Sequence, residues 1–237
     1  MLALVGKDAD SILSSRGNLS QWRTLISESS FATSPPERTC AITKLTVVAF
    51  APGGQPIVGA NCSQPGRVGI FEYTSATWRS FAPRRPASMS YATIQVIRLI
   101  SVSGTVSAIV AARTGSHTVL IAARYGPGLN GWEISHPLAV AQSVQVLSSG
   151  TSSGGVFVVL SSGSPKPVEV ERTLGASWAR LPTVPDGTET IATASGGQID
   201  ALVPKGSVFA VYRLDVSEGR WRRAQVINVP IEYDSSS

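Results

Sequence analysis

Tryptophan is spaced almost regularly along this chain. Its five tryptophans are Trp22, Trp78, Trp132, Trp178 and Trp221, so successive ones lie 56, 54, 46 and 43 residues apart. Each tryptophan follows a comparable series of short apolar segments and turns. Self-similarity at a period of roughly 40–50 residues is typical of proteins that repeat one small supersecondary unit. The spacing therefore predicts five structural repeats.

Each repeat contains several strand-like segments, rich in β-branched residues and often alternating between apolar and polar. The segments nearest the tryptophans are residues 11–14, 68–73, 118–125, 168–172 and 208–214. More continuously apolar segments precede these at residues 1–5, 55–60, 106–112, 155–160 and 198–203. Four repeats begin one segment earlier still, at residues 44–50, 93–100, 143–147 and 188–194. The turns expected between these first two segments of a repeat are 52–54, 103–104, 150–154 and 196–197.

A turn rich in Gly, Ser or Asn lies just before each tryptophan, as at residues 74–77 and 126–131. Because Gly and Asn tolerate the positive φ of a tight hairpin, the tryptophan is expected to begin the last, outermost strand of its repeat. Three repeats also carry an apolar residue three positions later, namely Leu25, Phe81 and Leu181. We expect the tryptophans to fill the space between neighbouring repeats rather than to bind ligand.

Four strands per repeat resemble the blade of a β-propeller, which implies a five-bladed all-β ring of four-stranded antiparallel blades. We expect a single domain over residues 1–237. The first repeat lacks its innermost strand, whereas residues 226–231 form an extended segment without a blade of their own. The C-terminal strand is therefore expected to close the ring at the first blade. The alternative is truncation, with this segment beginning a further blade.

Composition narrows the range of functions. Only 15% of the residues are charged, and the net charge of +5 is spread over the chain without a block of like charges. Nucleic-acid binders usually gather their basic residues on one face, so we expect a solvated basic surface and no nucleic-acid partner. No segment approaches the length of a membrane span, and no secretory signal is present. The chain begins abruptly inside a strand, which suggests an excised domain.

Cys40 and Cys62 are the only cysteines. A hairpin turning at residues 53–54 places Cys62 opposite Leu45 and Cys40 just beyond the start of the same strand. This proximity predicts a disulfide, with two buried free thiols as the alternative. A disulfide in a propeller favours a secreted or cell-surface protein.

Groups suited to catalysis are few. His117 and His136 lie in a turn and a linker and are expected to face solvent, so neither serves a Ser-His-Asp triad. The carboxylates best placed for glycoside hydrolysis are Asp200, Glu169 and Glu171, which only tertiary contacts could bring together. We therefore assign no catalytic residue, no metal site and no cofactor.

The sequence motifs of known propeller families are absent or incomplete in this chain. The sialidase Asp-box needs Asp five residues before Trp, where this chain has Gly17, Tyr73, Pro127, Thr173 and Val216. The chain also lacks the Trp-Asp and kelch patterns. It resembles fucose-binding propeller lectins in blade length and in the Gly-x-Trp of Gly219 and Trp221. Those lectins repeat an Arg, a Glu and a Trp in every blade, and here Glu171 and Arg172 stand alone.

Arg84 and Arg85 form a basic pair in a linker between two repeats, and loops at one face of a propeller usually carry binding. We assign these two arginines as candidate ligand-binding residues. The sequence therefore predicts a monomeric, non-enzymatic interaction module that contacts a protein or carbohydrate through loops around a central channel. The alternatives are a glycoside-processing hydrolase or lyase and a sugar-binding lectin.

Overall fold

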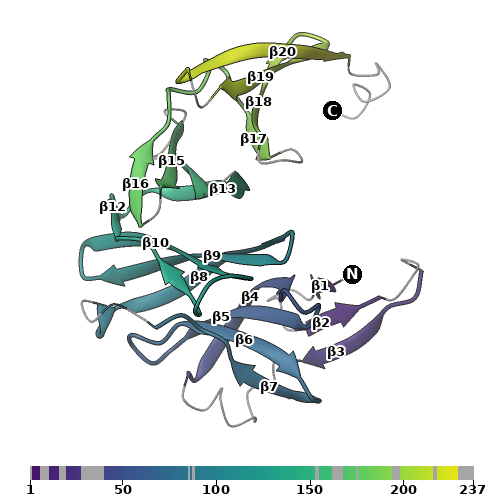
Figure 1. Ribbon diagram of the computed structural model, residues 1–237, viewed down its shortest axis with the longest axis vertical. Coiled ribbons are helices and arrows are strands. Elements are labelled where there is room, and N and C mark those ends of the chain that lie inside the picture. The colour runs from purple at the N-terminus through teal and green to yellow at the C-terminus, as the bar shows by residue number, and fades with distance from the viewer. Residues whose placement is uncertain are drawn as a thin grey trace. The chain divides into compact units, whose positions relative to one another are not determined.

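The computed structural model describes residues 2–5, 11–15, 20–27, 40–84, 86, 89–152, 155–161, 168–174, 176–193, 198–215 and 218–228. These residues form twenty β-strands, and none of them lies in an α-helix (Figure 1). All the strand pairings between them are antiparallel. The prediction of an all-β fold with antiparallel sheets is confirmed.

Two compact units make up the chain, Met1–Gln142 and Ser143–Ser237. In the first unit the described residues form three sheets (Figure 1). The first sheet contains β1 (Leu2–Val5), β2 (Ser11–Ser14) and β3 (Arg23–Ser27). The second contains β4 (Ile42–Phe50), β5 (Pro56–Cys62), β6 (Gly69–Thr74) and β7 (Thr77–Ser80). The third contains β8 (Thr93–Val102), β9 (Thr105–Thr114), β10 (His117–Tyr125), β11 (Glu133–Ile134) and β12 (Leu138–Val140).

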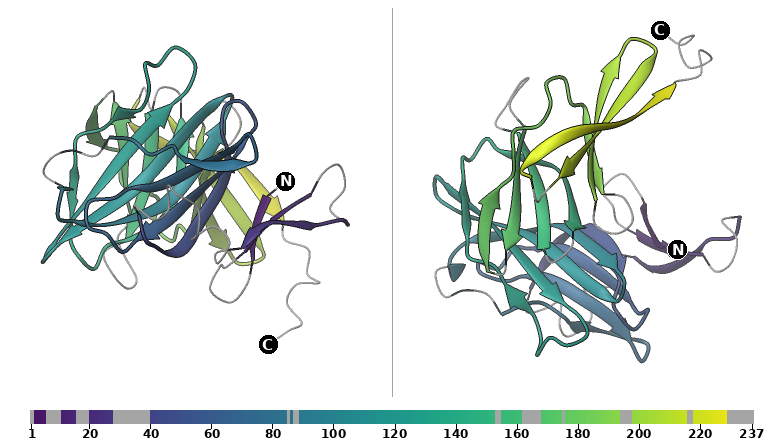
Figure 2. Two further views of the ribbon diagram at one scale, coloured as in Figure 1. Left: turned by 90° about the horizontal axis from the view of Figure 1, so that it is seen from below. Right: turned by 45° about the horizontal axis from the view of Figure 1, so that its top comes forward.

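The described part of the second unit forms two sheets of four strands in sequence order (Figure 2). The fourth sheet contains β13 (Gln145–Ser152), β14 (Gly155–Ser161), β15 (Val168–Leu174) and β16 (Ser177–Arg180). The fifth contains β17 (Thr190–Thr193), β18 (Ile199–Lys205), β19 (Val208–Asp215) and β20 (Arg220–Asn228). Short strands joined in order by turns follow from the alternating apolar pattern and the Gly-rich breaks between its segments.

Each tryptophan lies at or just before the start of the strand that ends its sequence repeat. Trp78, Trp178 and Trp221 lie within β7, β16 and β20, whereas Trp22 and Trp132 directly precede β3 and β11. This placement confirms the prediction that the turn before each tryptophan leads into the last strand of its repeat.

Neighbouring sheets in each unit share apolar clusters to which three of the five tryptophans contribute. Leu25 of the first sheet and Trp78 of the second belong to one cluster, and Phe81 and Trp132 belong to the next. In the second unit Leu181 and Trp221 share a third cluster. The apolar residue that follows one tryptophan therefore packs in the same cluster as the tryptophan of the next repeat. This supports the predicted packing role.

The second and third sheets approach each other closely at Gly59. A Cβ atom at this position would lie 2.6 Å from Cγ2 of Val47 and 2.7 Å from Cγ1 of Val96. Val47 belongs to β4 and Val96 to β8, so the glycine allows the two sheets to meet at this point. The cluster beside it includes Ile57, Ile94 and Val110, all almost fully buried.

The last strand of the third sheet is divided in a way that the sequence analysis did not predict. Both β11 and β12 pair with β10. Between them the backbone N–H of Ser135 donates to the oxygen of Ala122 at 2.8 Å, and Ser135 Oγ accepts from the N–H of Ala122 at 3.0 Å. Pro137 follows and has no N–H to continue the ladder. At this break, the hydroxyl oxygen of the buried Ser135 thus accepts the N–H of Ala122 in place of a backbone oxygen.

Two predictions about strand ends are wrong. Val226, Ile227 and Asn228 pair with β19 as part of β20, so they are not a spare strand available to the first sheet. A bulge between Val211 and Tyr212 extends this pairing by adding a residue on β20. Residues 229–231 lie outside the described part of the chain. In the fourth sheet β13 runs to Ser152, although residues 150–152 were expected to form a turn.

Cys40 and Cys62 form the predicted disulfide, with a Cα–Cα distance of 4.9 Å. Both cysteines are buried. The predicted register is wrong, because Cys62 lies opposite Ile42, three residues before Leu45, and Leu45 lies opposite Ala60. Two bulges in β4 account for two of these residues, and the hairpin turn, which pairs Phe50 with Pro56, accounts for the third. Each bulge sets two residues of one strand against one of its partner, which a simple hairpin count cannot include.

The hairpin between β6 and β7 contains backbone strain that a single substitution should relieve. Ser75 and Ala76 have φ of 50° and 61°, values that glycine adopts without cost. A left-handed conformation costs a non-glycine residue about 1–2 kcal/mol, and glycine loses about 0.5–1 kcal/mol through chain entropy. We expect Ala76→Gly to raise the free energy of unfolding by about 0.5–1 kcal/mol.

Urea denaturation checks this expectation. The matched control is Ala139→Gly in β12, where the exposed alanine has no positive φ and the entropy cost acts alone. This control should lower stability. Equal destabilisation by both substitutions would refute the strain at Ala76.

Candidate functional site

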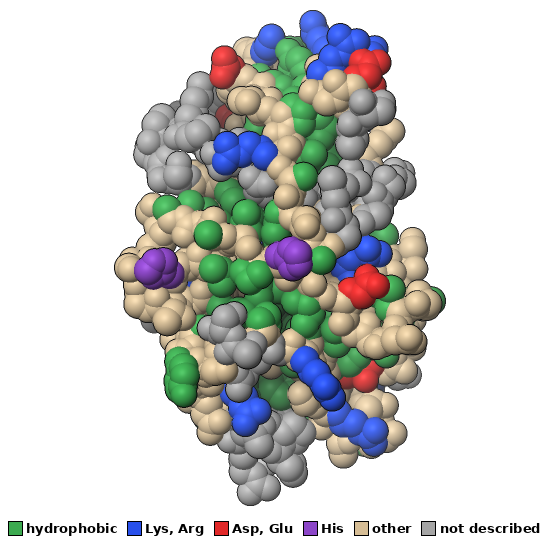
Figure 3. Space-filling view, turned by 60° about the vertical axis from the view of Figure 1, so that its left-hand side comes forward, with side chains coloured by type: hydrophobic (Ala, Val, Ile, Leu, Met, Phe, Trp, Pro, Cys, Tyr) green, Lys and Arg blue, Asp and Glu red, His purple; other side chains and the backbone are tan. Residues whose placement is uncertain are grey.

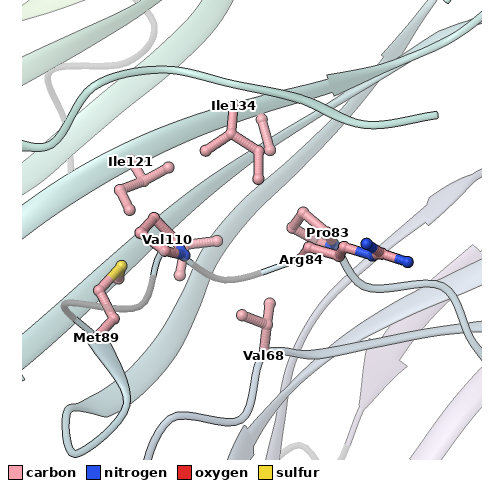
Figure 4. A pocket seen from close by; sticks show the side chains of 9 residues that line it. Val68, Pro83, Arg84, Met89, Val110, Ile121 and Ile134 are labelled. Atoms are coloured by element: carbon pink, nitrogen blue, oxygen red, sulfur yellow. The ribbon is translucent and has the colours of Figure 1, made fainter. Parts of the chain in front are cut away.

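An apolar hollow lies among the described residues of the first unit. It is lined by Val68, Pro83, Arg84, Pro86, Met89, Val110, Ile121, Ala123 and Ile134. Its empty space is about 260 Å³, which includes space open to solvent. Figure 4 shows the aliphatic side chains from several segments directed toward a common space. The hollow lies where the segment after β7 crosses the strands of the third sheet.

The third sheet supplies one wall through its strand register. Ile121 of β10 lies opposite Val110 of β9, and Ala123 lies opposite Ile134 of β11. Ile121 and Ala123 are two residues apart and therefore share a face of their strand. The alternation that predicted these strands thus also determines the apolar lining.

The second wall is a proline-rich segment. Pro83 and Pro86 have no N–H group, so neither offers a backbone donor to the hollow. Arg84 between them is exposed and is the only charged residue in the lining. Among the described residues none forms an ion pair with Arg84. The hollow is therefore apolar with one cation beside it.

Three half-buried aromatic residues hold the start of this segment in place. The ring centroid of Phe81 lies 4.7 Å from that of Tyr125 and 5.2 Å from that of Trp132, both in edge-on geometry. The indole N–H of Trp132 donates to the backbone oxygen of Phe81 at 2.7 Å. The N–H of Phe81 donates in turn to the oxygen of Ile70 at 2.8 Å. These contacts fix Phe81 just two residues before Pro83.

Several described residues of the second unit form ion pairs. Nε and Nη2 of Arg213 donate to the two carboxylate oxygens of Asp200 at 3.0 and 3.3 Å. This pairing raises the pKa of Arg213. Asp200, one of the predicted candidate acids, is thus held by a bidentate cross-strand partner. Both oxygens of this carboxylate therefore already accept hydrogen bonds from Arg213.

Glu218 in the turn before β20 accepts hydrogen bonds from Arg222 and Arg220. These bonds, that of Arg222 first, hold the pKa of Glu218 below its ordinary value of 4.5. Asp215 accepts the N–H of Glu218 at 3.1 Å and lies 3.7 Å from Nε of Arg222. This cluster supports the turn and faces solvent.

A pH titration should show that Arg222, and not its neighbour Arg223, lowers the pKa of Glu218. Because the pKa of Glu218 is lowered in the folded state, its ion pairs stabilise the fold fully at pH values above the ordinary carboxyl pKa. This stabilisation is lost as the pH falls through the lower pKa of the folded state. In a ¹³C NMR titration, we expect the Glu218 midpoint to lie below 4.5 and to rise in Arg222→Gln. Arg223→Gln is the matched control and should leave it unchanged. An unchanged midpoint in Arg222→Gln would disprove the pairing.

The structure locates most of the predicted site residues. Arg84 borders the hollow, and Arg85 lies outside the described residues. His117 and His136 are both exposed, and Figure 3 shows two separate imidazoles at the surface. Glu169 and Glu171 belong to β15, and their side chains lie outside the described structure.

Within the described ranges, no cluster of three His, Cys, Asp or Glu side chains could hold a metal ion. The apolar lining of the hollow was not predicted from the sequence. Its signal was the pair of prolines on either side of the candidate arginines.

No protein-family model matches the chain, and no curated protein has significant sequence similarity to it. Among solved structures, the chain is similar to the polysaccharide lyase Uly1 with a TM-score of 0.48 and 11% identity, over 80% of this chain and 50% of the lyase. It is similar to oligopeptidase B from Trypanosoma brucei with a TM-score of 0.47 and 11% identity, over 94% of this chain and 32% of the peptidase.

A third similar structure is a candidate 6-phosphogluconolactonase from Bacteroides uniformis, with a TM-score of 0.40 and 11% identity, over 93% of this chain and 78% of that protein. The chain thus spans half of the lyase and a smaller share of the peptidase.

Proposed function

We propose that the chain is a single five-bladed β-propeller domain that acts as a non-enzymatic protein-interaction module. Five successive antiparallel sheets among the described residues support five blades. The shared apolar clusters between consecutive sheets within each unit support their packing as neighbouring blades. A rigid array of this kind presents its linkers as a binding surface.

The observation that carries the proposed function is the chemistry of the hollow. A carbohydrate needs several hydrogen-bond partners for its hydroxyl groups, whereas eight of the nine lining residues are apolar. Such a lining suits apolar contact with the surface of a protein better than contact with a sugar. The aromatic residues beside the hollow pack edge-on against one another, which leaves less ring face for a sugar.

The glycoside-processing alternative has less support. It needs two carboxyl groups about 5–10 Å apart, one acting as acid and one as base or nucleophile. Asp200 is already bound to Arg213 on both oxygens. The described residues therefore favour binding over catalysis.

A parallel screen of peptides and glycans tests the proposed function. The complete chain is exposed to a displayed random-peptide library and to a glycan array at the same concentration. We expect enrichment of related peptides and no saturable glycan binding. Saturable binding of one glycan class without any peptide enrichment would replace the protein-interaction proposal with a lectin. Release of reducing ends from a polysaccharide would replace it with an enzyme.

We further propose that the protein works outside the cytoplasm, either secreted or at the cell surface. The disulfide suggests an oxidising environment, because such bonds are rare in reducing compartments. No helix in the described part of the chain is long and apolar enough to cross a membrane. Protein isolated from its native source without reductant should yield no titratable thiol. Two thiols per chain would contradict the proposed location.

We also propose that the protein is a monomer. The exposed strand β20 carries three arginines and a bulge, and both features protect a sheet edge from pairing with another chain. Sedimentation equilibrium should give the mass of one chain. A concentration-dependent dimer would contradict this expectation.

A further inference from the structure

We infer that the outer edge of β20 binds an extended segment of a partner protein as an added antiparallel strand, and that this segment carries an aliphatic residue two positions before an acidic one. This inference rests on the proposed protein-interaction function and specifies the chemistry of the partner. It concerns Arg223 and residues 225–228 at the end of β20.

The length of β20 distinguishes it from the other strands that end a repeat. Those strands are short or interrupted, since β3 has five residues, β7 and β16 have four each, and β11 and β12 have two and three. β20 has nine residues, and all of them except Trp221 are exposed. Short edge strands limit pairing with another chain, whereas a long exposed edge favours it. The described outer edge of the fifth sheet is therefore long enough to accept a further strand.

The free main-chain groups of β20 supply the hydrogen bonds of this pairing. β20 lies at the end of its sheet, and among the described strands it pairs only with β19 (Figure 2). In an antiparallel pair, alternate residues direct their N–H and C=O groups away from the partner strand. An extended peptide that bonds to such groups gains the main-chain hydrogen bonds of strand addition. We expect an antiparallel orientation, because it is slightly more stable per residue than a parallel one.

The bulge in β20 brings a cation and an aliphatic side chain to the same face of the sheet. Arg223 lies opposite Tyr212 of β19. Val226 lies opposite Ala210, two residues earlier on β19. Residues two apart in a strand share a face, so Arg223 and Val226 also share one. In a regular strand their separation of three residues would place them on opposite faces. An added strand can therefore meet both with two of its own residues that are two positions apart.

Arg223 is the cation that remains available to the added strand. Glu218 accepts hydrogen bonds from Arg220 and Arg222, whereas no described residue forms an ion pair with Arg223. Val226 is 43% exposed, so contact with an aliphatic residue removes apolar surface from water. Cross-strand pairs of opposite charge and of apolar side chains both stabilise a sheet. The partner segment is thus expected to place its acidic residue beside Arg223 and its aliphatic residue beside Val226.

The same charges disfavour a second copy of this chain as the occupant. β20 contains no Asp or Glu, so a second β20 offers no acidic residue to Arg223. Like charges directly opposite each other in a sheet are destabilising. The three arginines therefore protect this edge against self-association and favour an acidic strand of another protein. The bulge confines regular main-chain pairing to residues 225–228, and the acidic side chain reaches past it to Arg223.

Backbone amide NMR measures this pairing directly. The complete chain is labelled with ¹⁵N and titrated with a capped hexapeptide in which valine lies two positions before glutamate among threonines. We expect saturable shifts of the amide signals of residues 225–228. The signals of Thr77–Ser80 in β7 should stay fixed, because this outer strand is short and serves as the internal control. Equal shifts in β7 and β20 would overturn the choice of edge.

Methylation of the peptide backbone separates strand pairing from side-chain contact. Two versions of the peptide carry N-methyl groups on opposite sets of alternating residues. Only one set of N–H groups faces β20 in an added strand. One version should therefore bind about tenfold more weakly or worse, and the other should bind nearly as well as the parent peptide. Equal weakening by both versions would overturn main-chain pairing.

Altered side chains test the order and charge of the partner segment. Glutamine in place of glutamate should weaken binding about two- to fivefold, as expected for one exposed ion pair. A peptide with glutamate two positions before valine should also bind more weakly, because an antiparallel strand then cannot meet Arg223 and Val226 together. Stronger binding of this reversed peptide would overturn the antiparallel orientation.

Two protein variants complete the test. Arg223→Gln removes the charge, so it should bind the glutamate and glutamine peptides equally. An unchanged Glu218 titration in this variant shows that the neighbouring turn is intact. Arg113→Gln is the matched control at an exposed arginine of β9, and it should behave as the wild type. A persistent preference for glutamate in Arg223→Gln would overturn the pairing with Arg223.

The possible failures are distinguishable from those of the proposed function. Library peptides that bind while the amide signals of residues 225–228 stay fixed would overturn the β20 edge as their site and leave the interaction function standing. A dimer in sedimentation equilibrium that the hexapeptide dissociates would assign the edge to a second copy and overturn the inference. Absence of any peptide binding, together with glycan binding, would overturn both the inference and the proposed function.

Discussion

Replacing Trp78 by alanine is expected to lower the free energy of unfolding by about 3–5 kcal/mol. The indole is 5% exposed and belongs to a cluster with Leu45, Val58 and Phe71. Its ring centroid lies 5.2 Å from that of Tyr73, directly across the hairpin. Removal loses this burial and leaves a cavity that β-sheet neighbours cannot readily fill. Chemical denaturation followed by circular dichroism measures the loss.

Trp22→Ala is the matched control for this prediction. Trp22 holds the corresponding place in its repeat and is 37% exposed, so its replacement should cost clearly less than that of Trp78. A small loss for Trp78→Ala, together with lost ligand binding, would instead make the tryptophan a recognition residue.

Removing the disulfide by Cys40→Ala with Cys62→Ala is expected to lower the free energy of unfolding by about 3 kcal/mol. The two cysteines are 22 residues apart in sequence, and the bond restricts this loop in the unfolded chain. Both residues also belong to the cluster that contains Trp78. Urea denaturation of the double variant and of the wild type measures the effect.

The same experiment in reductant provides the control. Reductant should lower the stability of the wild-type protein toward that of the double variant and leave the double variant unchanged. Because Trp78 and the disulfide share a cluster, the combined substitutions should not add exactly. Equal stability of wild type and double variant without reductant would show that the bond contributes nothing.

The strands were largely predictable because local pattern determines them. Alternation in residues 118–125 and the apolar segment 106–112 correspond to β10 and β9 within a few residues. The turn at Ser103 and Gly104 was also predictable, since both adopt the positive φ that a tight hairpin requires. The tryptophan positions also predicted the last strand of each repeat, because a local turn pattern lies directly before each tryptophan.

Departures from regular pairing could not be predicted. The bulges in β4 shift the register at Cys62, and the bulge between β19 and β20 lets the last strand reach Asn228. A bulge is decided by packing around the strand, and hydrophobic alternation carries little sign of it. The interruption between β11 and β12 depends on the side chain of Ser135, which bonds to a residue 13 positions away.

The candidate site was predictable only in part. Arg84 was singled out because it lies in a linker between repeats. The hollow beside it depends on Ile121, Ala123 and Ile134, which the sequence marks only as ordinary strand residues. A concave surface arises when separate segments meet, so it appears only once the register and the course of the linker are known.

Hydrogen exchange of the indole N–H groups tests most directly whether the tryptophans are packing elements between repeats. The N–H of Trp132 donates to the oxygen of Phe81 at 2.7 Å, and that of Trp221 donates to the oxygen of Pro182 at 3.1 Å. Both acceptors lie just beyond the last strand of the preceding repeat. We predict that these two indole signals exchange far more slowly than in the urea-unfolded chain and do not shift when glycans are added. Exchange at the unfolded rate, or a saturable shift with a glycan, would contradict the account.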